Sequence, residues 1–260
     1  MVQVFRFSTK KTLSELIAAL SCLDINDVMR FEEMFDRQYH ALSHMYDALS
    51  EPSVFLGLIV LNALVCYQLS CGGEDYWWEF SEHFSSKPPH LSDATHRLIE
   101  FVSTSRCNGR LRDQKKRRIV RAQDYVWKRC ASPDSLIGEQ LEFIRGLAGN
   151  LRTSMRAKTI AFAAKILNYG LRIITKKRIP APQEIDIPLD SRIIKISRAL
   201  GIRNPVLFWR EVAREIGIPP LHIDSILWVG YRLVSTPQKN IGGNMDIVLR
   251  ILRNVLAQHA

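Results

Sequence analysis

Two lysines stand seven residues apart in a segment whose other side chains are mostly small or apolar. These are Lys158 and Lys165, within residues 156–167, and on a helix that spacing points them the same way. A lysine held against apolar walls near a second cation has its ammonium form disfavoured, and the neutral amine is a nucleophile that can form a Schiff base. The alternative, which periodicity alone favours, is that both amines reach solvent over short alanine side chains.

A carboxylate that could work with such an amine is Asp190. It follows a proline-spaced stretch and precedes an apolar helical pattern that begins at Ser191. We therefore predict that it caps a helix, where free backbone N–H groups and the helix dipole keep a carboxylate ionised. An anion fixed there could orient a lysine or stabilise developing positive charge, although a capping role alone would also explain the residue.

A third pattern fits the recognition of a purine base. Asp224 and Trp228 are one helical turn apart behind Pro219 and Pro220, so a carboxylate would lie beside an indole. An indole offers a flat surface for stacking, and a carboxylate accepts hydrogen bonds from the N1–H and N2–H₂ groups of guanine. Trp77, next to Trp78, is a second candidate stacking surface. Either tryptophan could instead be a core residue, and Asp224 could be a cap.

The charge balance points to a polyanionic partner. The 260 residues carry 36 Lys and Arg against 26 Asp and Glu, a net charge of +10, which suits nucleic acid first and an anionic membrane second. The cations gather in two clusters, which we expect to contact phosphates unless they are only solvated helix faces. The first contains Arg110, Arg112, Lys115, Lys116, Arg117, Arg118 and Arg121, and the second Arg172, Lys176, Lys177 and Arg178.

Several classes of protein are excluded by absent patterns. The longest apolar run, 54–67, is shorter than the roughly 20 residues of a spanning helix, and the first residues do not form a secretion signal. The five cysteines are odd in number and include no C-x-x-C pair, which favours reduced core thiols in a cytosolic chain. His40 and His44 have a metal-compatible spacing but lack a third ligand, so we expect no metal and no cofactor.

The elements that must position these residues are all expected to be helices, because apolar residues recur at three and four positions. A capping box at Thr12 and Glu15 predicts the start of the first helix. The connector 179–190, with three prolines, is expected to be stiff and extended and to be a chain crossing between two lobes. Further helices are predicted at 31–48, 54–69, 76–84, 92–104, 115–130, 134–146, 155–171, 191–200, 205–216, 220–234 and 244–258.

Taken together, these segments resemble the archaeal 8-oxoguanine DNA glycosylases called AGOG, a branch of the helix-hairpin-helix glycosylase superfamily. The matching stretches, in chain order, are 36–39, 73–77, 158–169, 186–190 with Arg192, and 219–228. The resemblance implies an all-α fold of two lobes with the active-site cleft between them. One lobe would comprise 1–75 and 186–260, and the other 76–185, which would carry the hairpin at about 147–156 and the nucleophile helix 155–171.

The resemblance also implies a reaction and roles for individual residues. The enzyme would extrude 8-oxoguanine from duplex DNA, Lys158 would attack the sugar and form a Schiff base, and the strand would be cut by β-elimination. Asp190 would stabilise the sugar cation and handle protons. The flipped base would be sandwiched by two tryptophans and bound along its polar edges by Gln38, Lys165 and Asp224; the tryptophans would be Trp77 and Trp228.

Two points are left open by that resemblance. The lesion carries a donor at N7, so the pocket needs an acceptor there, either the Gln38 amide oxygen or a backbone carbonyl. The superfamily hairpin is Gly-rich, whereas 149–154 has one glycine and adds Arg152, Thr153 and Ser154, so which amides hold the DNA backbone is undecided.

The expected partner is double-stranded DNA containing 8-oxoguanine, bound by a monomer without a membrane or cofactor, in the cytoplasm of an archaeal cell and associated with its nucleoid. Two alternatives remain at this point. One is a superfamily glycosylase for another damaged base, and the other is a non-enzymatic helical nucleic-acid-binding module.

Overall fold

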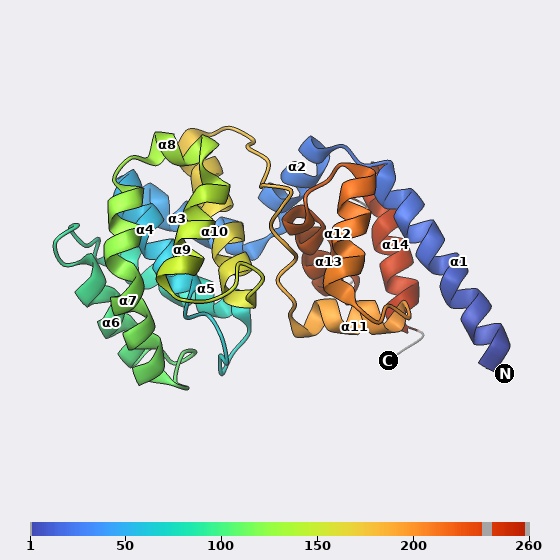
Figure 1. Ribbon diagram of the computed structural model, residues 1–260, viewed down its shortest axis with the longest axis horizontal. Helices are drawn as coiled ribbons and strands as arrows, with labels where there is room; N and C mark the ends of the chain where they lie inside the picture. The colour runs from blue at the N-terminus through green and yellow to red at the C-terminus, as the bar shows by residue number, and fades with distance from the viewer. Residues whose placement is uncertain (1, 236–240, 258–260) are drawn as a thin grey trace. The chain divides into compact units, whose positions relative to one another are not determined.

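The computed structural model of the protein describes residues 2–235 and 241–257, and every regular element in those ranges is an α-helix. The all-α prediction is therefore confirmed (Figure 1). The helices, in order, are α1 (Val2–Ser21), α2 (Ile25–Phe35), α3 (Arg37–Leu49), α4 (Pro52–Ala63), α5 (Gly73–Ser86), α6 (Ala94–Thr104), α7 (Arg112–Cys130), α8 (Pro133–Gly138), α9 (Gln140–Asn150), α10 (Lys158–Thr175), α11 (Ser191–Ala199), α12 (Pro205–Ile216), α13 (Pro220–Val234) and α14 (Gly243–Ala257).

Some predicted boundaries are wrong in instructive ways. Helix α1 runs through Thr12 without a break, so the predicted capping box does not start a helix. The predicted helix 31–48 spans part of α2 and most of α3, because Asp36 is extended between them, with ψ 109°. Helix α4 ends at Ala63, well before the predicted residue 69, and the chain soon reaches Gln68, whose φ of 48° is incompatible with a right-handed helix.

The chain forms two compact units. The terminal unit comprises the residues up to Asp36 and those from Asp186 onward, and the central unit comprises Arg37–Ile185. The sequence placed the first crossing near residue 75, but α3 packs on α5, and α4 packs on α7 and α10. Helices α3 and α4 therefore belong to the central unit, and the first crossing lies at 36/37.

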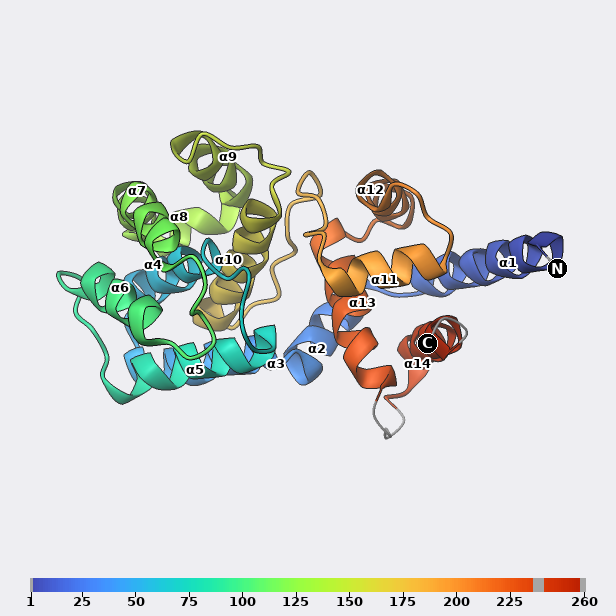
Figure 2. The same ribbon diagram turned by 90° about the horizontal axis from the view of Figure 1, so that it is seen from below.

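The central unit is built around α4, whose residues from Val54 to Ala63 are all buried. Two glycines let its neighbours approach closely: a Cβ on Gly57 would collide with the Trp127 ring of α7, and a Cβ on Gly170 of α10 would collide with Ile59 and Leu56. Figure 2 shows α10 and α7 beside this helix. The close packing fixes α10, the helix that carries both candidate lysines.

The core of the terminal unit joins the two ends of the chain. Helix α1 packs on α14, and α13 packs on α2, α11 and α14. Trp209 is fully buried in this core and donates its indole N–H to the Ser197 hydroxyl at 3.0 Å. At the start of this part of the chain, the buried Asp186 accepts two hydrogen bonds of 2.5 Å from the Arg210 guanidinium. This bidentate pair anchors the segment that leads to Asp190.

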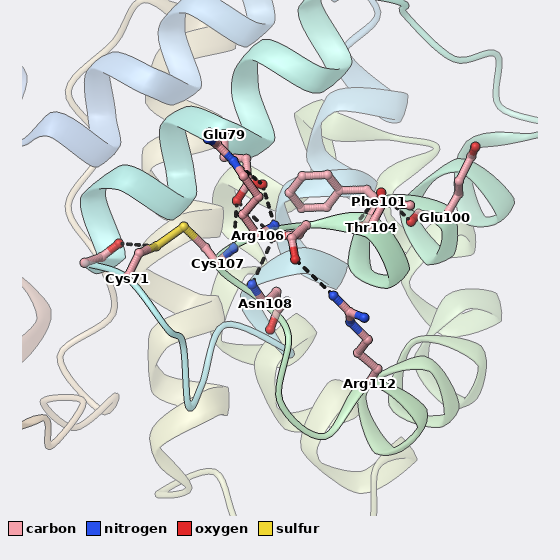
Figure 3. A network of polar contacts seen from close by, with 11 residues as sticks. Cys71, Glu79, Glu100, Phe101, Thr104, Arg106, Cys107, Asn108 and Arg112 are labelled. Carbon is pink, nitrogen blue, oxygen red and sulfur yellow. Dashed lines mark hydrogen bonds and ion pairs between the residues drawn. A yellow bond between two sulfur atoms is a disulfide. The ribbon is translucent and has the colours of Figure 1, made fainter.

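A disulfide between Cys71 and Cys107 corrects the expectation that the cysteines are reduced, mostly core thiols. It joins loop 64–72 to loop 105–111, which are also linked by a hydrogen bond from Ser70 N–H to the Cys107 carbonyl at 2.8 Å. Glu79 of α5 supports the second loop, because it accepts from the Ser105 hydroxyl and from two backbone N–H groups, as Figure 3 shows. Both loops are therefore held firmly.

The remaining cysteines differ in environment. Cys22 is exposed, whereas burial raises the pKa of the Cys66 and Cys130 thiols to about 12. Within the described ranges, no group of three or more His, Cys, Asp or Glu side chains is placed to hold a metal ion. None of the described helices has the length and apolar character needed to cross a membrane.

Candidate active site

Lys158 is the first residue of α10, and its side chain is exposed. In the described part of the chain its amine makes no hydrogen bond and no ion pair. Lys165, two turns later, is buried, with its Nζ 5.6 Å from the centroid of the Tyr169 ring. The two lysines therefore lie in different environments. The alternative that the amines reach solvent describes Lys158 but not Lys165, because the apolar stripe begins after Lys158, at Ile160.

The residues around Lys158 come from α7 and from loop 64–72. Arg118 of α7 donates from Nη2 to the hydroxyl of Thr159, the residue after Lys158, at 2.8 Å. The ammonium groups of Lys158 and Lys115 both lower the pKa of the Cys66 thiol, although burial outweighs them. Lys158 therefore lies near α7 and loop 64–72, at the start of α10, and its side chain remains exposed.

Two cations that the sequence assigned to phosphate contact are inside the fold. Lys115 is completely buried, its ammonium donates to the Asn108 side-chain oxygen, and it lies 4.9 Å from the centroid of the Tyr67 ring. Arg172 is also buried, 5.2 Å from the Tyr39 ring. Neither side chain can reach a phosphate from these positions. Of the neighbours on α7, Arg117 is exposed and Lys116 is half-buried.

The predicted hairpin is a helix cap followed by a tight turn. Helix α9 ends with backbone hydrogen bonds from Arg152 N–H to the Gly149 carbonyl and from Thr153 N–H to the Ala148 carbonyl, the pattern of a Schellman motif. Arg152 occupies the left-handed position, at φ 50°, where glycine is usual. Ser154 then accepts from Arg156 N–H at 3.1 Å. The side chains of Arg152 and Ser154 are exposed, and that of Thr153 is half-buried.

Two further predicted site residues lie in the central unit. Gln38 is buried in the first turn of α3. Trp77 of α5 is completely buried and packs edge-to-face on Phe80 at 5.4 Å and against Phe162 at 6.1 Å. Its ring is part of an aromatic core cluster, so the stacking surface expected from the sequence is not open in this structure.

Asp190 lies in the terminal unit with both carboxylate oxygens engaged. Oδ1 accepts from the backbone N–H of Ile193 at 2.9 Å, so the prediction that Asp190 caps a helix, α11, is confirmed. Oδ2 accepts from the indole N–H of Trp228 at 2.7 Å. That second bond links residues 38 positions apart, and no local sequence pattern indicates it.

The ring of Trp228 is also covered by a cation, Arg192, for which the sequence predicts no individual role. The Arg192 guanidinium lies 4.0 Å from the ring centroid and donates to the Trp228 carbonyl at 3.3 Å. Asp224, one turn earlier on α13, is buried. The predicted residues thus fall into two sets: Gln38, Trp77, Lys158 and Lys165 in the central unit, and Asp190, Asp224 and Trp228 in the terminal unit.

Comparison with known proteins gives a consistent result. A family model described as AGOG, N-glycosylase/DNA lyase, matches residues 17–256. A Thermococcus kodakarensis protein named N-glycosylase/DNA lyase is 36% identical over 251 residues, 94% of each chain. A protein of the same name from Methanopyrus kandleri is 40% identical over 207 residues, 79% of this chain and 84% of that protein.

The fold is similar to a solved structure as well. That structure is the 8-oxoguanosine complex of Pa-AGOG, an 8-oxoguanine DNA glycosylase from Pyrobaculum aerophilum. The TM-score is 0.79 at 26% sequence identity, over 94% of this chain and 96% of that one.

Proposed function

The chain belongs to the AGOG family of N-glycosylase/DNA lyases, and from that premise we propose that it removes 8-oxoguanine from DNA through a Schiff base on Lys158. The observation that carries the proposal is the exposed amine of Lys158, which makes no hydrogen bond or ion pair in the described residues. A lyase needs an amine that a sugar carbon can reach. The 8-oxoguanosine bound to the Pa-AGOG relative supports the choice of base.

The reaction begins with attack by the Lys158 amine on C1′ of the deoxyribose. The bond from C1′ to the base breaks, the base leaves with the electron pair and takes up a proton, and opening of the sugar ring gives the Schiff base. Loss of a proton from C2′ and cleavage of the bond between C3′ and its oxygen then cut the strand. The carboxylate of Asp190 stabilises the positive charge that develops on the sugar.

Recognition of the base is assigned to buried polar groups. Asp224 accepts from the N–H groups of the guanine edge, and Gln38 and Lys165 complete the polar contacts. The donor that oxidation creates at N7 needs an acceptor, because an unmatched buried polar group costs about 1–3 kcal/mol. Stacking on the base is assigned to Trp228. Trp77 would provide a second stacking surface if the aromatic cluster that buries it opens.

The DNA backbone is assigned to side chains on the surface of the central unit. They are Arg152, Thr153 and Ser154 of the hairpin, with Lys116, Arg117 and Arg118 of α7. Cations that neutralise phosphates release counterions, so binding should weaken steeply with salt. In this proposal the protein acts as a monomer on double-stranded DNA in an archaeal cell, associated with the nucleoid.

The test is borohydride trapping on a duplex that contains one 8-oxoguanine. Wild type should form a covalent adduct that survives denaturation, and Lys158→Gln should lower its yield by about a thousandfold or more while leaving DNA affinity largely intact. Lys128→Gln is the matched control, because it removes the same charge from an exposed position at the end of α7 and should trap normally.

Three results would contradict the proposal. A normal adduct from Lys158→Gln would exclude this lysine as the nucleophile, and faster release of uracil or an alkylated base than of 8-oxoguanine would exclude the assigned base. If the protein binds DNA in a salt-sensitive way but shows no preference for the lesion and forms no adduct, it is a non-enzymatic nucleic-acid-binding module.

A further inference from the structure

Three cations of the central unit gather at the beginning of α10. Arg118 reaches it through the 2.8 Å hydrogen bond to Thr159. Lys115 lies over the Tyr67 ring in the adjoining loop, and both it and Lys158 act on the Cys66 thiol of the same loop. The positive charge is therefore concentrated where the lysine nucleophile of the proposed function begins its helix.

This cluster has no carboxylate to balance it. Lys115 bonds to the neutral Asn108 side chain, Arg118 bonds to a hydroxyl, and Lys158 bonds to nothing; none of the three forms an ion pair within the residues described. Burial lowers the pKa of both Lys115 and Arg118, which reflects the cost of holding cations there. Uncompensated charge of one sign at a partly buried site favours an anionic ligand.

Of the three cations, Arg118 is the one suited to bind a phosphate. Lys115 is fully buried and its ammonium is already engaged. The Arg118 guanidinium is half-buried, and only one hydrogen bond, to Thr159, occupies its donors. That bond ties the guanidinium to the residue next to Lys158, and a guanidinium fork matches two phosphate oxygens.

We propose that Arg118 binds the 3′-phosphate of the nucleotide attached to Lys158 and stabilises it as the leaving group of strand cleavage. The inference rests on the proposed function, because it takes Lys158 as the nucleophile. Arg118 would then act chiefly in the lyase step, and less in the release of the base.

The chemistry explains why that step needs a cation. From the Schiff base, a C2′ proton is lost to a base, a C2′–C3′ double bond forms, and the C3′–O bond breaks. The electron pair of that bond leaves with the phosphate. A phosphodiester with one negative charge becomes a phosphomonoester, which carries a charge of about −1.5 to −2 at neutral pH. A fixed guanidinium interacts more strongly with that product than with the starting diester, and so lowers the barrier.

The experiment separates the two steps in single-turnover reactions of the full chain. Base release is measured on a duplex with one 8-oxoguanine after alkaline cleavage of abasic sites, and strand cleavage on the same samples without alkali. For Arg118→Gln we expect strand cleavage to slow about 10- to 100-fold, base release to change less than about threefold, and the borohydride adduct to accumulate.

Three further variants distinguish the role from a structural one. Arg118→Lys keeps the charge without the fork and should recover part of the cleavage rate. Thr159→Val removes the acceptor that orients Arg118 and should slow cleavage a few-fold, even if Arg118→Gln folds poorly. Lys128→Gln removes an exposed charge ten residues further along α7 and should leave the ratio of the two rates unchanged.

Equal losses of base release and strand cleavage in Arg118→Gln, or no loss of either, would overturn the inference. A duplex with a preformed abasic site keeps this result separate from the proposed substrate. If wild type cleaves the abasic duplex but fails to release 8-oxoguanine, the base assignment fails, while the effect of Arg118→Gln on abasic cleavage still decides the role of Arg118.

Discussion

The amine of Lys158 and the carboxylate of Asp190 are held in opposite ways. Lys158 is exposed and makes no hydrogen bond or ion pair among the described residues. Asp190 is half-buried, and each of its oxygens accepts a hydrogen bond, one from a helix N-terminus and one from an indole. A nucleophile must move and change its bonding during the reaction, whereas a charge that stabilises a cation works best when it is already oriented.

The largest expected effect tests whether the fixed carboxylate contributes its charge. Asp190→Asn keeps an oxygen for the cap but removes the negative charge, so we expect base release to slow on the order of 10³-fold, with only a small loss of thermal stability. The measurement is single-turnover excision together with a melting curve. A large fall in Tm with a modest fall in rate would show that Asp190 is chiefly a structural cap.

The second prediction concerns the disulfide of the central unit, the unit that carries the exposed amine of Lys158. The disulfide closes a sequence separation of 36 residues, so Cys71→Ser with Cys107→Ser should lower the free energy of unfolding by up to about 4 kcal/mol. Chemical denaturation of wild type and of the double variant measures this difference in the free energy of unfolding. Addition of reductant should destabilise wild type and leave the double variant unchanged, and equal responses of the two would contradict a contribution from this bond.

A smaller effect is expected when only one restraint on Asp190 is removed. Trp228→Phe keeps an aromatic ring but loses the N–H that donates to Oδ2. A hydrogen bond to a charged group contributes about 1.5–3 kcal/mol, so we expect base release to slow by roughly 10- to 100-fold. Unchanged base release in Trp228→Phe would show that this hydrogen bond does not contribute to the reaction.

The smallest effect is a pH dependence of stability that comes from Lys115. Burial lowers its pKa in the folded protein, so the folded state loses this proton at a lower pH than the unfolded state, whose pKa is about 10.4. Wild type should therefore gain stability relative to Lys115→Met as pH rises through the folded pKa toward 10.4, and show no such gain at lower pH. Denaturation midpoints of the two proteins from pH 7 to 10 measure the difference.

Periodicity predicts a helix well where apolar residues recur along its whole length. Helix α13 spans the predicted residues 220–234. The same reasoning could have placed Lys115 correctly, since it lies on the buried stripe of α7 with Ile119, Ala122 and Val126. The density of neighbouring cations instead predicts phosphate contact for Lys115, and a side chain's charge does not tell which face of a helix it occupies.

Contacts between distant residues could not be predicted. The bond between Asp190 and Trp228 depends on how α11 packs on α13, and the bond between Arg118 and Thr159 depends on how α7 and α10 flank the same core helix. The disulfide joins two cysteines with no pairing motif. In each case the deciding information is tertiary geometry, which local patterns do not contain.

The terminal unit is assembled from both ends of the chain, and this imposes an order on its synthesis. The central unit is complete once residue 185 has been made, but α1 and α2 must wait for α13 and α14, the helices against which they pack. At about 5–20 residues per second, that delay is on the order of 10 to 50 s. During translation, side chains of α1 and α2 that this core buries in the folded protein, among them Leu16, Leu20 and Val28, therefore stay exposed until α13 and α14 have left the ribosome.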